Sequence, residues 1–577
     1  MDRKTYCTAE FNFIDVTALA DSRPVSTAAK DFSNMELFHR NVRQAAYGTM
    51  ELNQFVLDGS REIFPDSQPE DVPFWSDEKS DADCRYVKNP VLEVSFSENH
   101  SSIGLTLYFA DDIPSEVHIA WYTLFGTKLY DKVFYPDKRE YFCKCNVENY
   151  GKVVIEATRS SLPYRYTKMD HIQYGQMWRL GNDNMKSARI LEEIDATSAT
   201  VSSNTATVEL IDEADEFDTT DNNGLWKSLQ KEQTVAFTEY IDGRAVDCGM
   251  FFLEKWSSQK NLVKFELVDR IGLMDKTKFY DGMVYDGIPA GKIIDAVMKS
   301  CGVKKYEVAE DVAATVLSGW LAIQSHREAL QQVAFACGAL VDDRHSDTVR
   351  IYRQSRHIGR TIGGNRKFTG TKVTLDDYVS AVTISYKQYV QAAETSEISS
   401  SILAAGRRRI EFNDPYVPES ITVSVGSIAQ ARTNYVIVDM PEEKKCVISG
   451  RKYEAVENAY TAKVKAVAAG ENEKEKSYKG CTLVDAKQVR AVAENILEYL
   501  QLRQIVEMKY ISNGEEAGSW CDVGMAGGRS ATTCITSQTL DLTGGHIATA
   551  KCRGYCSTVT SYYFCGDELY AGEEGMI

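Results

Sequence analysis

The sequence lacks several features that would assign a function at once. In 577 residues, no apolar run approaches the roughly 18–20 residues that a membrane-spanning helix needs. The first residues, MDRKTYCTAEFNF, have neither the apolar core nor the small-residue cleavage site of a signal peptide. We therefore expect a protein that is made in a cytoplasm and has no transmembrane segment.

An excess of positive charge is also missing. Lys and Arg number 65 against 83 Asp and Glu, which gives a formal net charge of −18 at pH 7. Proteins that bind phosphate backbones need a basic surface, so nucleic acid is excluded as the main partner. The one dense basic run, Gly-Arg-Arg-Arg at 406–409, is too short to change this balance. We expect it to be solvated or to face another subunit.

Motifs for catalysis, metals and cofactors are missing too. The chain has no GxxxxGK[ST], GxGxxG, HExxH or GxSxG motif. Among its 14 cysteines the closest pairs are Cys143/Cys145 and Cys552/Cys556, with no second pair or histidine cluster at zinc spacing. The acidic stretch 212–221 lacks the glycine-pivoted spacing of a calcium loop and predicts a solvated loop. We therefore expect no enzyme, no catalytic residues, no metal and no cofactor.

Short alternating runs dominate what is present in the first third of the chain. Residues 92–96 alternate apolar and polar side chains, the period-2 pattern of a half-buried strand. Turn residues separate this run from similar ones at 103–109, 117–121, 132–134 and 152–155. Strands this regular, with no helix between them, predict a β-sandwich or jelly roll over 41–180. Residues 1–40 are poorly patterned and predict an N-terminal arm or edge element.

A second all-β region is expected at 186–285, where Asp242-Gly243 between two apolar runs predicts a hairpin. The pattern then changes to α/β over 286–365. Helices are predicted at 290–300 and after Ser325, which forms a capping box with Glu328; this second helix ends at Gly338. His326 lies in the first turn of that helix, and we expect it at the surface.

Strands resume at 366–480, and a C-terminal helix and β region follows at 481–577. Within the first of these, the small polar residues of 387–406 predict a mobile loop. Residues 485–502 carry a full apolar helical face and predict the clearest helix of the chain. The fold class is thus mainly β with an α/β insert, in several domains.

Aromatic residues supply the one candidate binding site. The N-terminal β domain contains Trp75, Tyr122 and Tyr164, and aromatic rings on the rim of a β-sandwich can stack on sugars. The same residue types are more often part of a core. We therefore treat these three as candidate glycan-binding residues, with a purely structural role as the alternative.

Several stretches resemble tail proteins of phages and prophages of Firmicutes. A strand at 188–195 is followed by an S-N-T turn at 203–205, LQKEQ at 229–233 and a G-x-F-x-L-x-x-W strand at 249–256. SGWL at 318–321 with SHREALQQVA at 325–334 resembles the α/β insert of baseplate hub proteins. ELNQFVLDGS at 51–60 with FWS at 74–76 resembles discoidin-like or galactose-binding-like jelly rolls, and GGHI at 544–547 fits the C-terminal β region of the family.

The resemblance implies a homotrimeric hub at the tip of a virion tail, capping the tail tube and linking it to the tip or spike. Each subunit would supply two hub-type β-barrels, 186–285 and 366–480, the second with or without the C-terminal strands, so that three subunits form a pseudo-six-fold ring. The implied partners are tail tube and distal tail proteins, the tape-measure protein, and tip, spike or receptor-binding proteins. Host-surface glycan is a further possible contact, and DNA would only pass through the lumen, which an acidic chain would repel.

Two other functions stay open from the sequence. A receptor-binding adhesin would place the main activity in 41–180. A tail-associated hydrolase of surface glycan or peptidoglycan would need a pair of carboxylates, and the many acidic residues allow one although no hydrolase motif is present.

Overall fold

The computed structural model describes residues 4–40, 43–56, 58–63, 72–213, 217–218, 229, 231–525 and 529–556. Strands hold 53% of the residues and helices 11%, which confirms the mainly β prediction. The chain divides into two compact units: unit 1 comprises Met1–Ala9, Leu180–Ala214 and Thr234–Ile577, and unit 2 comprises Glu10–Arg179 and Asp215–Gln233. Among the described residues, none of the helices is long and apolar enough to span a membrane. Most of the acidic stretch 212–221 lies outside the described residues.

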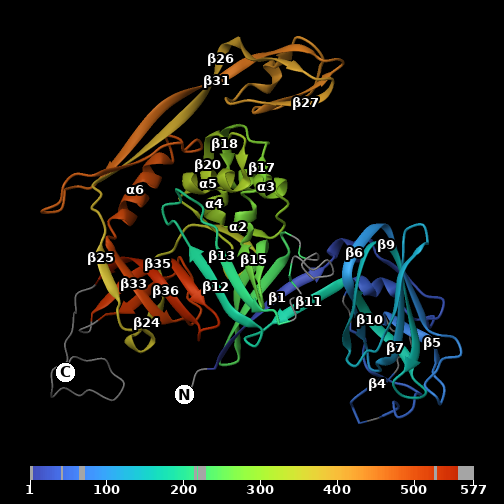
Figure 1. Ribbon diagram of the computed structural model, residues 1–577. Helices are drawn as coiled ribbons and strands as arrows, with labels where there is room; N and C mark the ends of the chain where they lie inside the picture. Colours follow the sequence, from blue (N-terminus) through green and yellow to red (C-terminus); the bar gives the residue numbers. More distant parts are fainter. Residues whose placement is uncertain are drawn as a thin grey trace, which may run out of the picture. The chain divides into compact units, whose positions relative to one another are not determined.

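Unit 2 is built on an antiparallel sheet (Figure 1). The predicted alternation is confirmed in its longest strands, where Leu92 and Val94 are buried and Ser95 is exposed. Trp121, Tyr150 and Phe109 lie in the same core. The strands, in sheet order, are β5 (Phe74–Lys79), β10 (Tyr166–Gln173), β6 (Val91–Phe109), β9 (Glu140–Ser160), β7 (Pro114–Tyr122) and β8 (Lys128–Phe134), with β2 (Arg23–Val25) pairing β6. The jelly-roll topology stays a prediction.

The expected N-terminal arm is corrected by the structure. Strand β1 (Thr5–Ile14) lies between β11 (Gly175–Leu180) and β14 (Thr234–Ile241), inside a sheet rather than at its edge. Cys7, Ala9 and Phe11 point to the same side of the strand and are buried. Because Cys and Ala are small, their alternation with polar residues is a weak sign of a strand in the sequence. The rest of 1–40 belongs to unit 2 and contains α1 (Val16–Asp21), β2 and η1 (Met35–His39), while β3 (Tyr47–Gly48) and β4 (Glu62–Ile63) follow.

Unit 1 begins with what we call the first β unit. Its strands are ordered β14, β15 (Arg244–Gln259), β16 (Leu262–Val268), β13 (Thr205–Ile211) and β12 (Met185–Glu193). The predicted hairpin is confirmed, because β14 pairs antiparallel with β15 through a turn in which Asp242 and Gly243 both have positive φ.

The α/β insert follows, with helices α3 (Ala290–Ser300) and α5 (His326–Cys337) packed in one core. The capping box is confirmed: Ser325 Oγ accepts from the Glu328 amide at 3.1 Å, and Glu328 Oε2 accepts from the Ser325 amide at 3.0 Å. Gly338 ends α5 with a φ of 58°. The other elements are α2 (Arg270–Leu273), α4 (Glu310–Ala313), β17 (Lys278–Phe279), β18 (Val284–Pro289), β19 (Tyr306–Val308), β20 (Val316–Trp320), β21 (Gln324–Ser325), β22 (Leu340–Asp342) and β23 (Val349–Tyr352).

The surface position predicted for His326 is wrong. The side chain is 2% exposed, with Nδ1 2.8 Å from Thr277 Oγ1 and Nε2 3.0 Å from Ser300 Oγ. The two hydroxyls satisfy both ring nitrogens, which allows the imidazole to be buried at the start of α5.

A second β unit completes the large sheet, and it differs from the predicted barrel at 366–480. Only one strand of the second β unit, β25 (Lys372–Leu375), comes from 366–480. The unit also contains β24 (Ile358–Ile362), which lies before that range, and four C-terminal strands. β35 pairs β12, so the two β units form one continuous sheet. The C-terminal strands are β33 (Gln504–Ile511), β34 (Trp520–Gly524), β35 (Ser530–Asp541) and β36 (Ile547–Cys556).

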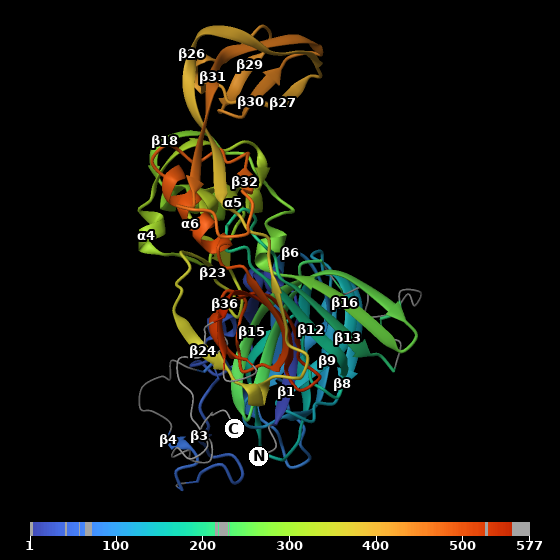
Figure 2. The ribbon, with the colours of Figure 1, turned by 90° about the vertical axis from the view of Figure 1, so that its left-hand side faces the viewer.

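Most of 381–463 forms a long two-stranded ribbon of β26 (Ala381–Leu403) and β31 (Lys444–Lys463), visible in Figures 1 and 2. The mobile loop predicted for 387–406 is therefore wrong for most of that range. Beyond its base, where Val382 and Ile384 are buried, β26 is largely exposed and has no alternation that a sequence could reveal. The ribbon carries a small sheet of β27 (Gly406–Glu411), β30 (Tyr435–Met440) and β29 (Ser427–Ala431), and its base packs on α6 (Val489–Leu500). Shorter elements are η3 (Gly364–Arg366), η4 (Pro418–Ser420), β28 (Thr422–Val423) and β32 (Glu475–Tyr478).

Candidate functional site

The structure separates the three candidate glycan-binding residues. Trp75 lies on β5 and is 3% exposed, so its ring has no free face for a sugar. Tyr122 is half-buried at the end of β7, and three strands lie between β5 and β7 in the sheet order. Tyr164 is 41% exposed in the turn before β10. Trp75 is therefore removed from the candidate set, while Tyr122 and Tyr164 keep surface that a ligand could reach.

The surroundings of Trp75 form a buried polar cluster that the sequence did not predict. The ring packs at its edge on Phe32, with 5.5 Å between centroids, and beside Tyr166 at 6.1 Å. The ammonium of Lys168 lies 4.4 Å from the centre of the indole. A cation over a tryptophan face is favourable, and desolvation strengthens the attraction.

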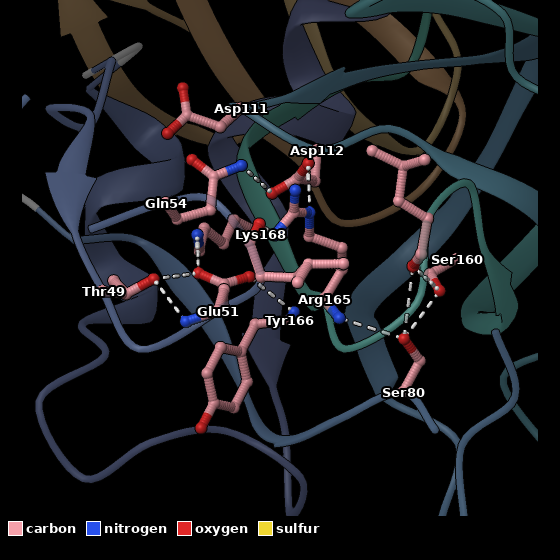
Figure 3. Close-up of polar contacts among 12 residues, drawn as sticks. Thr49, Glu51, Gln54, Ser80, Asp111, Asp112, Ser160, Arg165, Tyr166 and Lys168 are labelled. Atoms are coloured by element: carbon pink, nitrogen blue, oxygen red, sulfur yellow. Dashed lines mark hydrogen bonds and ion pairs between the residues drawn. The ribbon is translucent and has the colours of Figure 1, made fainter. Parts of the chain in front are cut away.

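Glu51 supplies the counter-charge for Lys168 (Figure 3). Lys168 Nζ lies 2.7 Å from Glu51 Oε2, and the two side chains are 3% and 0% exposed. Oε2 also accepts from Thr49 Oγ1 at 2.5 Å, and Oε1 accepts from the Tyr166 amide at 2.8 Å. Both carboxylate oxygens are thus occupied, as a buried charge requires.

Arg165 extends the cluster on the same strand end. Its Nε lies 3.0 Å from Asp112 Oδ1, and its guanidinium also donates to the Leu52 carbonyl. Burial raises the pKa of Asp112, and Arg165 and Lys168 offset only part of this effect. The Arg165 amide donates to Ser80 Oγ at 3.0 Å (Figure 3).

Chemically, this arrangement fastens a loop to a sheet. Glu51 and Leu52 come from the loop 49–54, and their partners Arg165, Tyr166 and Lys168 lie at or next to the start of β10. A carboxylate with both oxygens engaged and no solvent access is not placed to exchange protons with a substrate. The motif ELNQF at 51–55 was the only sequence signal, because the pairing joins residues more than a hundred positions apart.

The cysteines and the basic run noted in the sequence lie in surroundings that give them structural roles. Burial raises the pKa of the Cys143 and Cys552 thiols, which keeps them protonated and unreactive. Within the described parts of the chain, no group of three or more His, Cys, Asp or Glu side chains could hold a metal ion. In the basic run, Arg407 pairs with Asp439 at 2.9 Å, and Arg409 lies 4.3 Å from the ring centre of Tyr280.

Comparison with known proteins gives likenesses in structure alone. No family model matches the chain, and no curated protein matches it in sequence. The structure is similar to a tail protein from Neisseria meningitidis, at 9% identity over 66% of this chain and 93% of that one, with a TM-score of 0.39. It is also similar to a prophage tail protein from Shewanella oneidensis, at 11% identity over 65% and 93%, with a TM-score of 0.38. A third is a prophage tail protein from Listeria monocytogenes, at 9% identity over 66% and 91%, with a TM-score of 0.37.

The buried pair Glu51–Lys168 makes a stability prediction. Lys168→Ala leaves the Glu51 carboxylate buried without its cation, and we expect a loss of about 3–5 kcal/mol in the free energy of unfolding. The double variant Glu51→Gln, Lys168→Met removes both charges and should recover most of this loss. Urea unfolding followed by tryptophan fluorescence measures both, since Trp75 adjoins the ammonium.

The matched control is Lys152→Ala, which breaks the ion pair with Glu93 in the same unit. That pair is 2.5 Å long, but its side chains are 37% and 44% exposed, so water replaces the lost partner. Equal midpoint shifts for Lys168→Ala and Lys152→Ala would show that burial of the cluster contributes nothing.

Proposed function

We propose that the protein is a structural hub of a phage-type tail tip, a homotrimer that caps the tail tube and links it to the tip or spike. The observation that carries this proposal is the pair of β units that lie side by side in one sheet, joined through β12 and β35, with an α/β insert between them in the chain. This is the order that the sequence resemblance to baseplate hub proteins implies. Two equivalent units per subunit would give three subunits a six-fold surface.

The join between the β units is reinforced by one buried carboxylate, Glu192 on β12. Its Oε1 lies 2.8 Å from Nε2 of His345, which follows β22 of the insert. Its Oε2 accepts from the Ala517 amide at 3.0 Å and from Gln538 Nε2 at 2.8 Å, both in the second β unit. Glu192 is 1% exposed. One side chain therefore binds the first β unit to both of its neighbours.

The charges at this join stabilise the contact between the first β unit and the insert. Burial raises the pKa of Glu192, but His345, the charge of Arg344 and the Ala517 amide together outweigh it and leave the pKa below its usual value. Burial lowers the pKa of His345, yet Glu192 raises it to about 9. Both groups are thus ionised near neutral pH, and each would be costly to bury alone. A hub under mechanical load needs such a rigid connection.

In this proposal the ring contacts tail tube and distal tail proteins on one side and tip, spike or receptor-binding proteins on the other. The tape-measure protein would end at the lumen, and DNA would pass through it without binding. The net charge of −18 supports passage, because an acidic lumen repels the DNA backbone. The protein would reside in the virion, at the tail tip.

The proposal predicts the mass and symmetry of the purified assembly. Light scattering after size exclusion should give three times the 64.7 kDa of one chain, and negative-stain images should show a three-fold ring with an axial opening. A protein that stays a monomer at all concentrations, and is absent from tail particles of its source, contradicts the proposal.

We further propose that the hub contacts host-surface glycan through unit 2. Tyr122, at the end of β7, continues into a hairpin that exposes three more aromatic rings: Phe125 is 96% exposed, Tyr135 64% and Tyr130 52%. Exposed rings without a protein partner suit stacking on sugar faces. Tyr164 would contribute from a separate turn.

A glycan array with the full-length protein tests this contact. Tyr122→Ala combined with Phe125→Ala should reduce binding several-fold, because each variant removes a stacking surface without emptying the core. Tyr555→Ala, at a ring 50% exposed on β36 in unit 1, is the matched control and should leave binding unchanged. Absence of binding to any glycan, or equal binding by all three proteins, refutes the proposal and leaves the structural role intact.

A further inference from the structure

Unit 1 contains a cavity of about 520 Å³ that the proposed hub role does not use. It is bounded by the loop after β12, the end of α6, and strands from the second β unit. Its apolar and aromatic walls include Tyr478, Tyr499, Leu500 and Ile505. A volume of this size accommodates a few residues of a peptide.

The cavity is more basic than the chain as a whole. Lys476, Lys551 and Arg553 line it, against Asp195 and Asp376. Asp376 is engaged by Arg553 NH1 at 2.7 Å. Asp195 accepts hydrogen bonds from the amides and hydroxyls of Thr197 and Thr200 in its own loop, which leaves it no free oxygen.

The lining thus holds three cations against two carboxylates, and Asp376 lies within the electrostatic reach of both Arg553 and Lys551. Lys476 lies over the Tyr478 ring at 5.4 Å, and neither it nor Lys551 forms an ion pair with any described residue. In a chain with a net charge of −18, a cavity lined by more cations than carboxylates favours an anionic occupant.

Polar atoms on the wall also lack partners. The Tyr478 hydroxyl and Arg553 Nε are both buried and make no hydrogen bond within the part of the chain that is described. Buried donors without a partner cost free energy, so such groups usually meet a ligand, a water or another segment. Together they offer an O–H and an N–H to a carboxylate.

We propose that this cavity is the docking site of the chain's own segment 557–577. That segment contains four carboxylates, Asp567, Glu568, Glu573 and Glu574, and no Lys, Arg or His. Tyr562, Tyr563 and Phe564 precede the carboxylates and match the aromatic walls. Both the charge and the apolar character of the segment are thus complementary to the cavity.

The stretch of chain between the cavity wall and the segment 557–577 is short. Strand β36 carries Lys551 and Arg553 on the cavity wall and ends at Cys556, immediately before the segment. Ten residues lead from Ser557 to Asp567, which span up to about 33 Å when extended. This suffices for a turn and a return along the end of β36. Tethering also raises the local concentration of the segment to about the millimolar range.

Zero-length carbodiimide coupling on the full-length protein tests the docking, because it joins a lysine amine to a carboxylate only where the two are in contact. We expect amide links from Lys551 or Lys476 to Asp567, Glu568, Glu573 or Glu574. Lys476→Glu combined with Lys551→Glu removes both amines and should abolish these links without moving them to other lysines. The control Lys445→Glu with Lys463→Glu makes the same charge change at exposed positions on β31 and should leave coupling at the cavity unchanged.

Two further measurements separate the rival occupants. In wild-type protein, 1 M salt should reduce the coupling, because the Debye length falls to about 3 Å. In a mixture of ¹⁵N-labelled and unlabelled chains, links within one chain support the proposal, and links only between chains overturn it by assigning the cavity to a second copy. Coupling of the segment to lysines over the whole surface, with no preference for these two, also overturns it. None of these outcomes depends on the trimer.

Discussion

The large sheet of unit 1 depends on a buried carboxylate. Glu192 lies where β12 meets β35, and it accepts hydrogen bonds from the second β unit while it is paired with His345 of the insert. Gln538 continues the network, since its Oε1 accepts from Tyr510 at 2.9 Å and its Nε2 also donates to the Glu515 carbonyl at 2.7 Å. A buried charge tolerates no loss of partners, so the three parts are held in a single arrangement.

This constraint explains how one chain presents two β units as a rigid pair. A seam of backbone hydrogen bonds between β12 and β35 sets their register, and the side chains around Glu192 fix the insert against it. Asn434 makes a similar link elsewhere in unit 1, where its amide donates to the carbonyls of Gly282 and Leu321 and connects the segment before β30 to the insert. Each connection uses a fully buried polar group whose loss leaves others unsatisfied.

Local sequence signals predicted the elements that depend on local physics. The capping box at Ser325 and Glu328, the turn at Asp242-Gly243 and the apolar face of 489–500 all formed where they were expected. The ribbon was missed because its strands have few buried side chains beyond their base, and β1 was missed because small residues occupy the buried positions of its first half. The second β unit was misplaced because its strands are separated by the ribbon, and pairing over that distance has no local signature.

The candidate site was predicted less well, for a physical reason. Trp75 was a candidate as an aromatic ring of the predicted β-sandwich, yet its partners Lys168 and Glu51 come from distant segments and bury it. A sequence shows that a residue can stack on a sugar, but it does not show which rings the fold leaves uncovered. Phe125, the most exposed large hydrophobic side chain, carries no motif at all.

Glu192 holds the two β units and the insert together. Hydrogen exchange of Glu192→Gln at pH 6.5 tests this role most directly, because His345 is charged in the wild-type protein at this pH and the variant removes the carboxylate that raises its pKa. The account predicts that protection falls together, by about a hundredfold, in β12, in residues 342–346 and in β35, since breaking a buried pair costs about 3 kcal/mol or more. A loss confined to β12, or unchanged exchange in the other two segments, would contradict it.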